Sequence, residues 1–138
     1  MGGSQGLNIL LDTHIILWSA AEEERISKRA IIEIESPANT LWYSPVSVWE
    51  ILVLAEKGRI QIGPLHEKAV REMFKKLPLK EAALNTEVAV QSRLIDLPHQ
   101  DPADRFLAAT AVVYGFTMLT ADKRILEARS FSTMPAVD

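Results

Sequence analysis

The sequence predicts an α/β fold built on a mainly parallel sheet. Short runs of apolar, β-forming residues alternate along the chain with segments of helical periodicity, and glycines and helix-capping residues stand at the ends of those segments. The chain has 138 residues, of which 48% are hydrophobic and 24% charged, so it is long enough to bury the core of one globular domain. We expect a single domain over residues 7–138, and we exclude residues 1–6 as a disordered lead or a cloning remnant.

The expected strands are short, and helices separate most of them. Strands are expected at residues 7–11, 41–44, 77–79, 116–120 and 132–137. Helices are expected at 13–20, from the cap Ser27 to a turn at 37–40, from Ser47 to Gly58, at 66–76, from Asn85 or Thr86 to about 95, from Asp101 to Gly115, and just after Asp122.

The composition narrows the functional classes. The chain has no cysteine, which excludes disulfides, thiolate metal sites and cysteine nucleophiles and is consistent with a cytoplasmic protein. The longest run without a charged residue, between Arg105 and Asp122, contains a glycine and is too short to cross a membrane. The net charge of −3 argues against a nucleic-acid footprint over the whole surface, although a local basic rim around a metal could still hold phosphates.

One acidic stretch organises the expected site. Asp101 and Pro102 form a helix-start signal, because aspartate accepts hydrogen bonds from the free amides of the first turn and proline fits the first helical position. Asp104 falls in the same turn, so two carboxylates lie at the positive end of one helix dipole, where a hydrated metal also fits. A doubly acidic helix cap without any chemistry would have the same sequence.

Three further acids are expected at the same edge of the sheet. Asp12 ends the first strand, Asp122 follows a later strand, and Glu50 lies in the first turn of the helix after the second strand. If the two strands before Asp12 and Asp122 are neighbours where the strand order reverses, their carboxylates converge. Each acid also has a structural explanation: Ser47 and Glu50 fit a capping box, and Asp12 and Asp122 could be helix caps.

These acids form a candidate metal site. Clustered carboxylates repel one another and resist ionising together unless a cation neutralises them. Hard oxygen ligands without cysteine favour Mg²⁺ or Mn²⁺ over zinc, and such an ion suits phosphodiester hydrolysis. No Ser-His-Asp or Cys-His grouping and no glycine-rich phosphate loop competes with this interpretation. Thr13 and Thr120 are expected to serve either turns or chemistry. For His14 and His99, which flank acidic residues, we favour structural roles over roles as a metal ligand or a base.

Four segments together resemble the motifs of the PIN-domain nucleases, and most closely those of the VapC toxins of bacterial and archaeal toxin–antitoxin pairs. The segments are Leu-Leu-Asp-Thr-His at 10–14, Ser-Val-Trp-Glu-Ile at 47–51, His-Gln-Asp-Pro-Ala-Asp-Arg at 99–105 and Leu-Thr-Ala-Asp at 119–122. In this resemblance the acidic quartet of the family is matched by Asp12, Glu50, Asp104 and Asp122. Asp101 matches a further acidic position, and Ala103 departs from a bulky residue, often phenylalanine, so that packing there could be looser.

The resemblance implies a PIN-like three-layer α/β/α fold with helices on both faces of a five-stranded sheet in the order 3-2-1-4-5. It also implies an endoribonuclease that needs Mg²⁺ or Mn²⁺, a homodimer, and silencing by a small cognate antitoxin. Lys123 and Arg124 could hold the RNA backbone or be solvated helix residues, and Arg105 could contact phosphate or, as we favour slightly, pair with an acid.

The tryptophans offer a surface for the antitoxin. A partner helix could lie in an apolar groove lined by Trp18, Trp42, Trp49, Ile15, Ile16 and Leu52. The alternative, which we favour for Trp42 and Trp49, is that they are core residues.

Two other functional classes stay open. A receiver-type phospho-acceptor module would use Asp12 with Asp122 and Lys123, although the paired acids of that chemistry stand together early in the chain. A non-catalytic binding module would keep the fold while its partner acts, and the intact quartet argues against it.

Overall fold

The computed structural model describes residues 6–138, which form a parallel sheet covered by helices. The strand order is β3-β2-β1-β4-β5, so the implied order 3-2-1-4-5 is confirmed. The strands are β1 (Asn8–Leu11), β2 (Thr40–Tyr43), β3 (Leu79–Glu81), β4 (Thr117–Thr120) and β5 (Thr133–Pro135). Most of the predicted lead, residues 1–5, lies outside the described residues.

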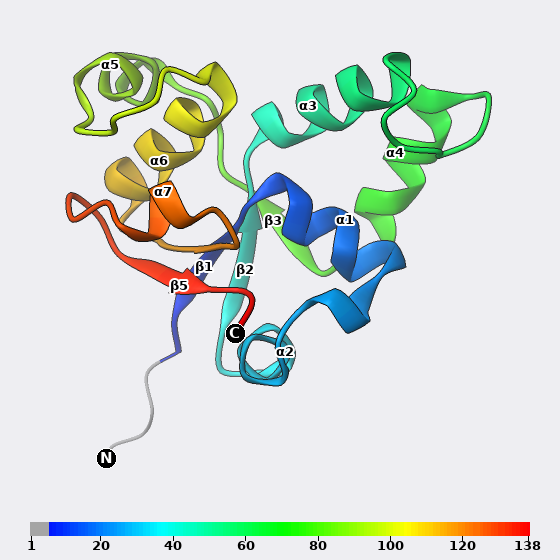
Figure 1. The fold of residues 1–138 in the computed structure, drawn as a ribbon, viewed down its shortest axis with the longest axis horizontal. Coiled ribbons are helices and arrows are strands. Elements are labelled where there is room, and N and C mark those ends of the chain that lie inside the picture. The colour runs from blue at the N-terminus through cyan, green and yellow to red at the C-terminus, as the bar shows by residue number, and fades with distance from the viewer. Residues whose placement is uncertain (1–5) are drawn as a thin grey trace.

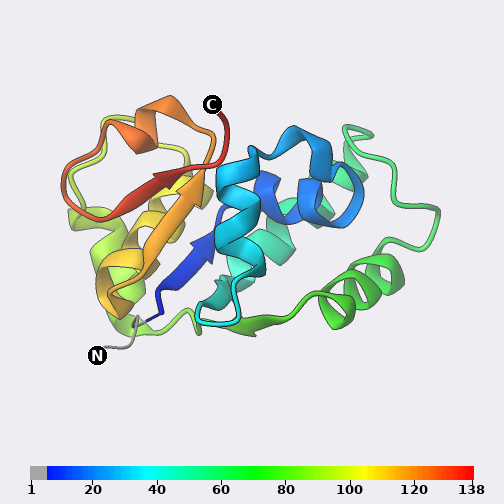
Figure 2. The ribbon, with the colours of Figure 1, turned by 90° about the horizontal axis from the view of Figure 1, so that it is seen from below.

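The helices form two layers, one on each face of the sheet (Figures 1 and 2). One layer holds α1 (Thr13–Ala21), α2 (Lys28–Glu35), α3 (Pro45–Glu56) and α4 (His66–Lys76), and a 3₁₀ turn (Glu23–Arg25) follows α1. The other holds α5 (Thr86–Leu94), α6 (Pro102–Tyr114) and α7 (Lys123–Leu126). The predicted α/β/α architecture is confirmed. None of the helices in residues 6–138 is long and apolar enough to span a membrane.

Successive apolar side chains of β1 are buried alternately in two hydrophobic clusters, one on each face of the sheet. Ile9 and Leu11 are buried in one cluster with Ile15 of α1, whereas Leu10 is buried in another with Leu107 of α6. Successive side chains of a strand point to opposite faces, so β1 supplies apolar contacts to both helical layers.

The strand order reverses beside β1, at the carboxyl edge of the sheet. Leu11 pairs with Leu119 of β4, and the amide of Asp12 donates to the Leu119 carbonyl at 3.0 Å. Because β2 lies on one side of β1 and β4 on the other, the edge beyond Leu11 and Thr120 is the switch point where parallel sheets place ligands. Asp12 and Asp122 follow these two neighbouring strands, as predicted.

Several helix ends confirm the capping residues named from the sequence. Ser27, Asn85 and Asp101 accept hydrogen bonds from backbone amides in the first turns of α2, α5 and α6. Gly115 ends α6 with a φ of 72°, a conformation that glycine adopts without steric cost.

The predicted start of α3 at Ser47 is wrong. The helix begins at Pro45, and the hydroxyl of Ser44 accepts the amide of Val46 at 3.1 Å as the N-cap. The pattern is the same cap-plus-proline signal that starts α6. The expected edge strand at 77–79 is displaced by two residues, since β3 covers Leu79–Glu81.

Trp42 and Trp49 lie in different environments. Trp42 is half-buried and stacks on Phe116 with ring centroids 4.9 Å apart, so its predicted core position is confirmed. Trp49 is 55% exposed, and the prediction that it is a core residue is wrong. Ile15 and Ile16 are fully buried, so the suggestion that they line a groove for a partner helix is also wrong.

Candidate metal centre

Five acidic side chains surround one cavity at the carboxyl edge of the sheet. The cavity has a volume of about 360 Å³. Its acidic lining consists of Asp12, Glu50, Asp101, Asp104 and Asp122, and the remaining lining residues are His14, Trp18, Ala121 and Arg124. The structure therefore brings together the four acids of the predicted quartet and the further acid Asp101, which come from the ends of β1 and β4 and from α3 and α6.

Asp12 is the buried acid of this cavity. It follows β1, caps α1 and is 8% exposed. One carboxylate oxygen accepts the Thr13 amide at 2.7 Å, and the other accepts the Thr120 hydroxyl at 2.6 Å. Burial raises the pKa of Asp12 above its ordinary value despite these hydrogen bonds, and the charge of Asp122 acts in the same direction. A bound cation would favour the ionised form.

Thr120 links the carboxylate of Asp12 to the backbone of Asp122. Its oxygen accepts the Asp122 amide at 3.0 Å while its hydrogen is donated to Asp12. Asp122 caps α7 by accepting the Arg124 amide at 2.8 Å, and the Arg124 guanidinium lies 3.4 Å from its second oxygen. Partial burial raises the pKa of Asp122, but the hydrogen bonds from Arg124 and from the Ile125 amide outweigh it, so the pKa lies below the ordinary value.

Glu50 lies in the second turn of α3, because that helix begins at Pro45. The capping-box explanation of Ser47 and Glu50 is therefore wrong. The Ser47 hydroxyl lies 2.8 Å from the hydroxyl of Thr13, and both groups are fully buried, so they tie α3 to α1. Burial raises the pKa of Glu50, as do the charges of Asp12 and Asp101.

The start of α6 contributes two carboxylates with different surroundings. Asp101 is the N-cap and accepts the amides of Ala103 at 2.9 Å and Asp104 at 3.3 Å. Asp104 points to the ring of His99, with Nε2 and Oδ2 2.9 Å apart. Burial, together with the charges of Asp12 and Asp101, raises the pKa of Asp104 to about 6. Ala103 is buried against the core, so its small side chain leaves this helix start packed.

Arg105 donates hydrogen bonds to the loop before α6 and does not line the cavity. The prediction that it pairs with an acid or contacts phosphate is wrong, because its guanidinium is buried and donates to backbone carbonyls. The acceptors are Ser92 and Ile95, at 2.8 and 2.9 Å, and Leu97 and His99, at 2.9 and 3.3 Å. Arg105 thereby fixes the segment that leads to His99 and Asp101.

Sequence reasoning underestimated two histidines. His99 contacts an acid of the cavity, and His14, which is exposed, lines the cavity from α1. Their positions in the sequence could have indicated this, because His14 stands two residues after Asp12 and His99 two residues before Asp101. Lys123 and Arg124 are both exposed at the start of α7, and Arg124 lines the cavity.

The carboxylate set fits a divalent cation. Burial raises the pKa of Asp12, Glu50 and Asp104, so these groups are costly to ionise together without a positive charge between them. Oxygen ligands of this kind suit Mg²⁺ and Mn²⁺.

The sequence model of the family described as PIN domain matches residues 9–130. The chain belongs to the PIN-domain family. All five acids of the cavity fall within the matched range of this PIN domain, and the resemblance named from the motifs is confirmed. A curated relative, Ribonuclease VapC22 of Mycobacterium tuberculosis (strain ATCC 25618 / H37Rv), is 32% identical over 120 residues, which are 85% of this chain and 88% of that protein.

Solved structures share the fold of this PIN domain. DNA-bound VapBC from Salmonella typhimurium has a TM-score of 0.68 at 16% identity and covers 94% of this chain and 98% of its own. VapBC2 from Rickettsia felis, bound to a DNA fragment from its promoter, has a TM-score of 0.66 at 12% identity with the same coverage of 94% and 98%. FitAcB from Neisseria gonorrhoeae has a TM-score of 0.62 at 18% identity and covers 91% and 96%. At these identities the likeness concerns the fold.

Proposed function

We propose that this PIN domain is a metal-dependent endoribonuclease and the toxin of a toxin–antitoxin pair. The observation that carries the proposal is the convergence of Asp12, Glu50, Asp104 and Asp122 on one cavity in a chain of this family. The relative named Ribonuclease VapC22 supports the reaction. We propose further that residues 7–138 act as one nuclease unit in the cytoplasm.

In this proposal the four carboxylates hold Mg²⁺ or Mn²⁺, directly or through water. The ion supplies, when bound, an acidified water and a positive charge beside the scissile phosphate. Thr120 keeps Asp12 and Asp122 in fixed positions relative to one another. Arg124, at the cavity, and the exposed Lys123 beside it would hold backbone phosphates of the RNA.

The phospho-acceptor alternative has less support. An acceptor aspartate needs an oxygen open to the phosphodonor, whereas Asp12 is buried and both of its oxygens accept hydrogen bonds.

The test is cleavage of total RNA by purified, partner-free protein with Mg²⁺ or with EDTA. We expect discrete fragments from the wild type with Mg²⁺, and loss of at least about 99% of the rate in Asp104→Asn, equivalent to about 2.7 kcal/mol. Asp96→Asn is the matched control, because Asp96 is exposed and does not line the cavity. Cleavage by Asp104→Asn at the wild-type rate, or cleavage in EDTA, would refute the proposal.

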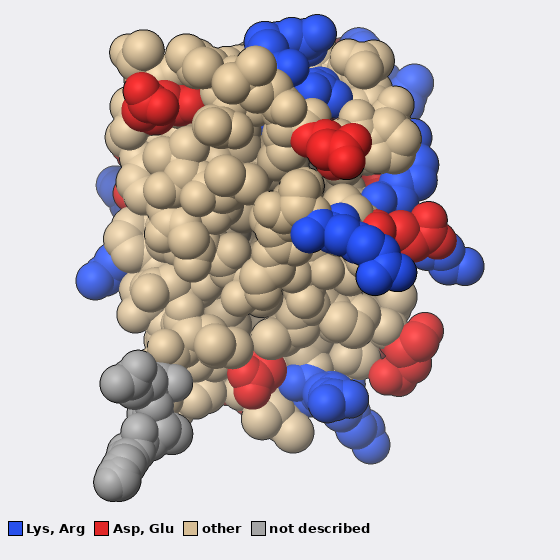
Figure 3. All heavy atoms as spheres, turned by 90° about the vertical axis from the view of Figure 1, so that its left-hand side faces the viewer, with Lys and Arg blue, Asp and Glu red and all other residues tan. Residues whose placement is uncertain are grey.

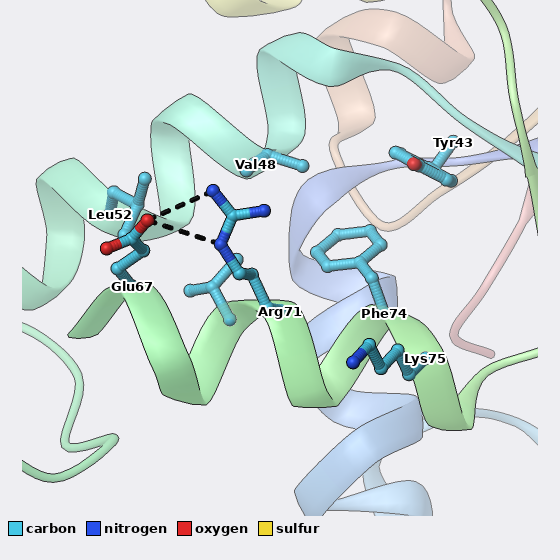
Figure 4. Close-up of a pocket in the computed structure, with 8 residues that line it drawn as sticks. Tyr43, Val48, Leu52, Glu67, Arg71, Phe74 and Lys75 are labelled. Carbon is cyan, nitrogen blue, oxygen red and sulfur yellow. Dashed lines mark hydrogen bonds and ion pairs between the residues drawn. The ribbon is translucent and has the colours of Figure 1, made fainter. Parts of the chain in front are cut away.

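We propose that the antitoxin binds an apolar groove between α3 and α4. Figure 4 shows this groove, which has a volume of about 510 Å³ and is lined by Tyr43, Val48, Leu52, Val70 and Phe74, among others. Leu52 is one of the residues expected from the sequence to face a partner helix. Glu67 and Arg71 form an exposed ion pair of 3.0 Å along α4, so the groove joins an apolar floor to a charged rim. Solved structures with this fold include a toxin–antitoxin complex from Klebsiella pneumoniae, which supports a protein partner.

Co-expression with a candidate antitoxin tests this surface. We expect the antitoxin to copurify with the wild type and with Ile32→Glu but not with Leu52→Glu, because a charge in the groove would be buried without a partner. Ile32 is a suitable control, since it is 66% exposed on α2. Copurification with Leu52→Glu at the wild-type ratio would exclude this groove.

We also propose a homodimer through the face formed by α5 and α6. Figure 3 shows that side of the molecule, where a broad area carries few charged side chains. The exposed apolar side chains of these helices include Val90 and Leu94 of α5, at 47% and 69%, and Val112 of α6, at 37%. Light scattering should give a dimer for the wild type and for Ile32→Glu and a monomer for Leu94→Glu. A Leu94→Glu dimer would exclude this face.

A further inference from the structure

Three potential ligand groups from separate segments meet at one side of the acidic cavity. His99 precedes α6, Asp104 lies in its first turn, and Asp122 caps α7. One ligand atom from each of these residues lies within 4.8 Å of the other two. Nε2 of His99 and Oδ2 of Asp104 are 2.9 Å apart, which is the separation of two adjacent ligands around an ion with bonds of about 2.1 Å.

The His99 ring is largely buried, and a hydrogen bond to the backbone of the same residue fixes the segment that carries it. Its side chain is 10% exposed, and that of Asp104 is 14% exposed. The carbonyl of His99 accepts from the buried guanidinium of Arg105 at 3.3 Å, which fixes the segment that carries the ring. The imidazole of His99 is therefore held beside Asp104 before a metal ion binds.

The hydrogen bonding of the His99 ring allows Nε2 to bind a cation. Within residues 6–138, Nδ1 of His99 is buried and has no hydrogen-bond partner. Buried polar atoms are nearly always paired, yet no acceptor in the described residues fixes the ring proton on Nδ1. Without a cation, Nε2 can donate its proton to Oδ2 of Asp104, so the proton of the neutral ring has two alternative positions. When the proton resides on Nδ1, the lone pair of Nε2 points toward Asp104 and is free to bind a cation placed between them.

We propose that His99 is a metal ligand and that His99, Asp104 and Asp122 form a position selective for Mn²⁺ and later first-row divalent ions over Mg²⁺. Mg²⁺ prefers oxygen ligands, whereas imidazole nitrogen binds transition ions well. Carboxylates alone would give little such discrimination. This proposal rests on the proposed metal-dependent function. It adds that the position formed by His99, Asp104 and Asp122 prefers transition-metal ions to Mg²⁺.

Pulsed electron paramagnetic resonance of the tag-free full chain loaded with Mn²⁺ tests the proposal without RNA. We expect nitrogen-14 modulation from a directly bound imidazole in the wild type, its loss in His99→Gln, and its retention in His14→Gln. Glutamine can still donate a hydrogen bond to Asp104, so it preserves positioning while removing the imidazole. His14 is the matched control because it lines the same cavity from α1.

Calorimetric titrations of the same proteins separate ligation from positioning. In His99→Gln the ratio of Mn²⁺ to Mg²⁺ affinity should fall by about tenfold or more, and in His14→Gln it should stay unchanged. Equal weakening of both ions, or nitrogen modulation that persists in His99→Gln, would overturn the proposal, as would Mn²⁺ bound to the wild type without modulation. His99→Asn replaces His99→Gln if circular dichroism shows that the latter is unfolded. Failure of the ribonuclease proposal would appear separately, as absence of RNA cleavage by a protein that still binds Mn²⁺.

Discussion

The hydroxyl of Thr120 joins Asp12 and Asp122 by donating to one and accepting from the amide of the other, at 2.6 and 3.0 Å. Both acids follow neighbouring parallel strands, so a single short side chain at the end of β4 ties the Asp12 carboxylate to the backbone that carries Asp122. In metal sites, partners of this kind orient the ligands and are costly to lose.

Thr120→Val should weaken Mg²⁺ or Mn²⁺ binding about 10- to 100-fold, because the Asp12 carboxylate loses a donor and the Asp122 amide loses its acceptor. The free energy of unfolding should also fall by about 1–3 kcal/mol, since buried polar groups are left unpaired. Calorimetry and urea unfolding measure the two effects. Thr110→Val is the control: that hydroxyl is buried but donates only to the carbonyl of Phe106 within α6, so metal affinity should not change. Equal metal affinities for both variants would contradict the role of Thr120.

Glu50→Gln should separate metal binding from fold stability. With the capping box excluded, the glutamate has no structural task at the start of α3, and its half-buried charge is disfavoured by Asp12 and Asp101. Mg²⁺ affinity should fall by more than about tenfold, equivalent to about 1.4 kcal/mol, while the metal-free protein keeps or gains stability. Glu56→Gln, exposed at the end of the same helix, should change neither. A metal-free Glu50→Gln protein less stable than the wild type would argue for a structural role.

The pKa of Asp104, about 6, predicts opposite pH trends for the metal-free and metal-bound protein. Because this pKa lies above the ordinary value of 3.8, the folded state holds the proton more tightly than the unfolded state. The contribution of Asp104 to stability is therefore full below pH 3.8 and is lost as pH rises from there through 6. A cation requires the ionised form, so the rise in Tm caused by Mn²⁺ should be larger at pH 7.5 than at pH 5.5.

Thermal melts in EDTA and in Mn²⁺ at these two pH values measure the trend. Asp104→Asn should reduce the difference between them, because asparagine does not titrate in this range. An equal Mn²⁺ effect at both values in the wild type would contradict the assignment of Asp104.

Arg105→Met should destabilise the fold by about 3 kcal/mol or more. The buried guanidinium satisfies carbonyls of the segment between α5 and α6, and methionine would leave them unpaired. Urea unfolding measures the loss. Arg71→Met, which removes an exposed ion pair of α4, should cost less than about 0.5 kcal/mol. If the two variants are equally stable, the carbonyl contacts of Arg105 do not hold the loop.

The fold could be predicted largely because local signals agreed with it. Asp101-Pro102 and Gly115 define α6 at both ends, and the apolar spacing of α4 gives its bounds directly. The start of α3 was misplaced because two signals competed. Ser44-Pro45 and the capping box at Ser47 both mark helix starts, and only the packing of Ser47 against Thr13 decides between them.

The sequence predicted the acidic residues of the site but not the hydrogen bonds that hold them in position. Position at strand ends and helix starts is local information, so Asp12 and Asp122 could be placed at one edge. The hydrogen bond from Thr120 to Asp12 joins residues 108 positions apart in the sequence. The carbonyl acceptors of Arg105 are placed by the conformation of a loop, which hydrophobic periodicity does not predict. Trp49 is exposed although its side chain is large and apolar, since α3 turns that position away from both cores.

We propose that the carboxylate cavity binds the divalent ion on which RNA cleavage depends. Calorimetric titration of Mn²⁺ into the wild type and into Asp12→Asn tests it most directly, because Asp12 is the acid that the other parts of the site converge on. We predict a saturable site in the wild type and at least about a hundredfold loss of affinity in the variant, equivalent to about 2.7 kcal/mol. Unchanged Mn²⁺ affinity in a folded Asp12→Asn protein, or no binding by the wild type, would show that these carboxylates do not hold the ion.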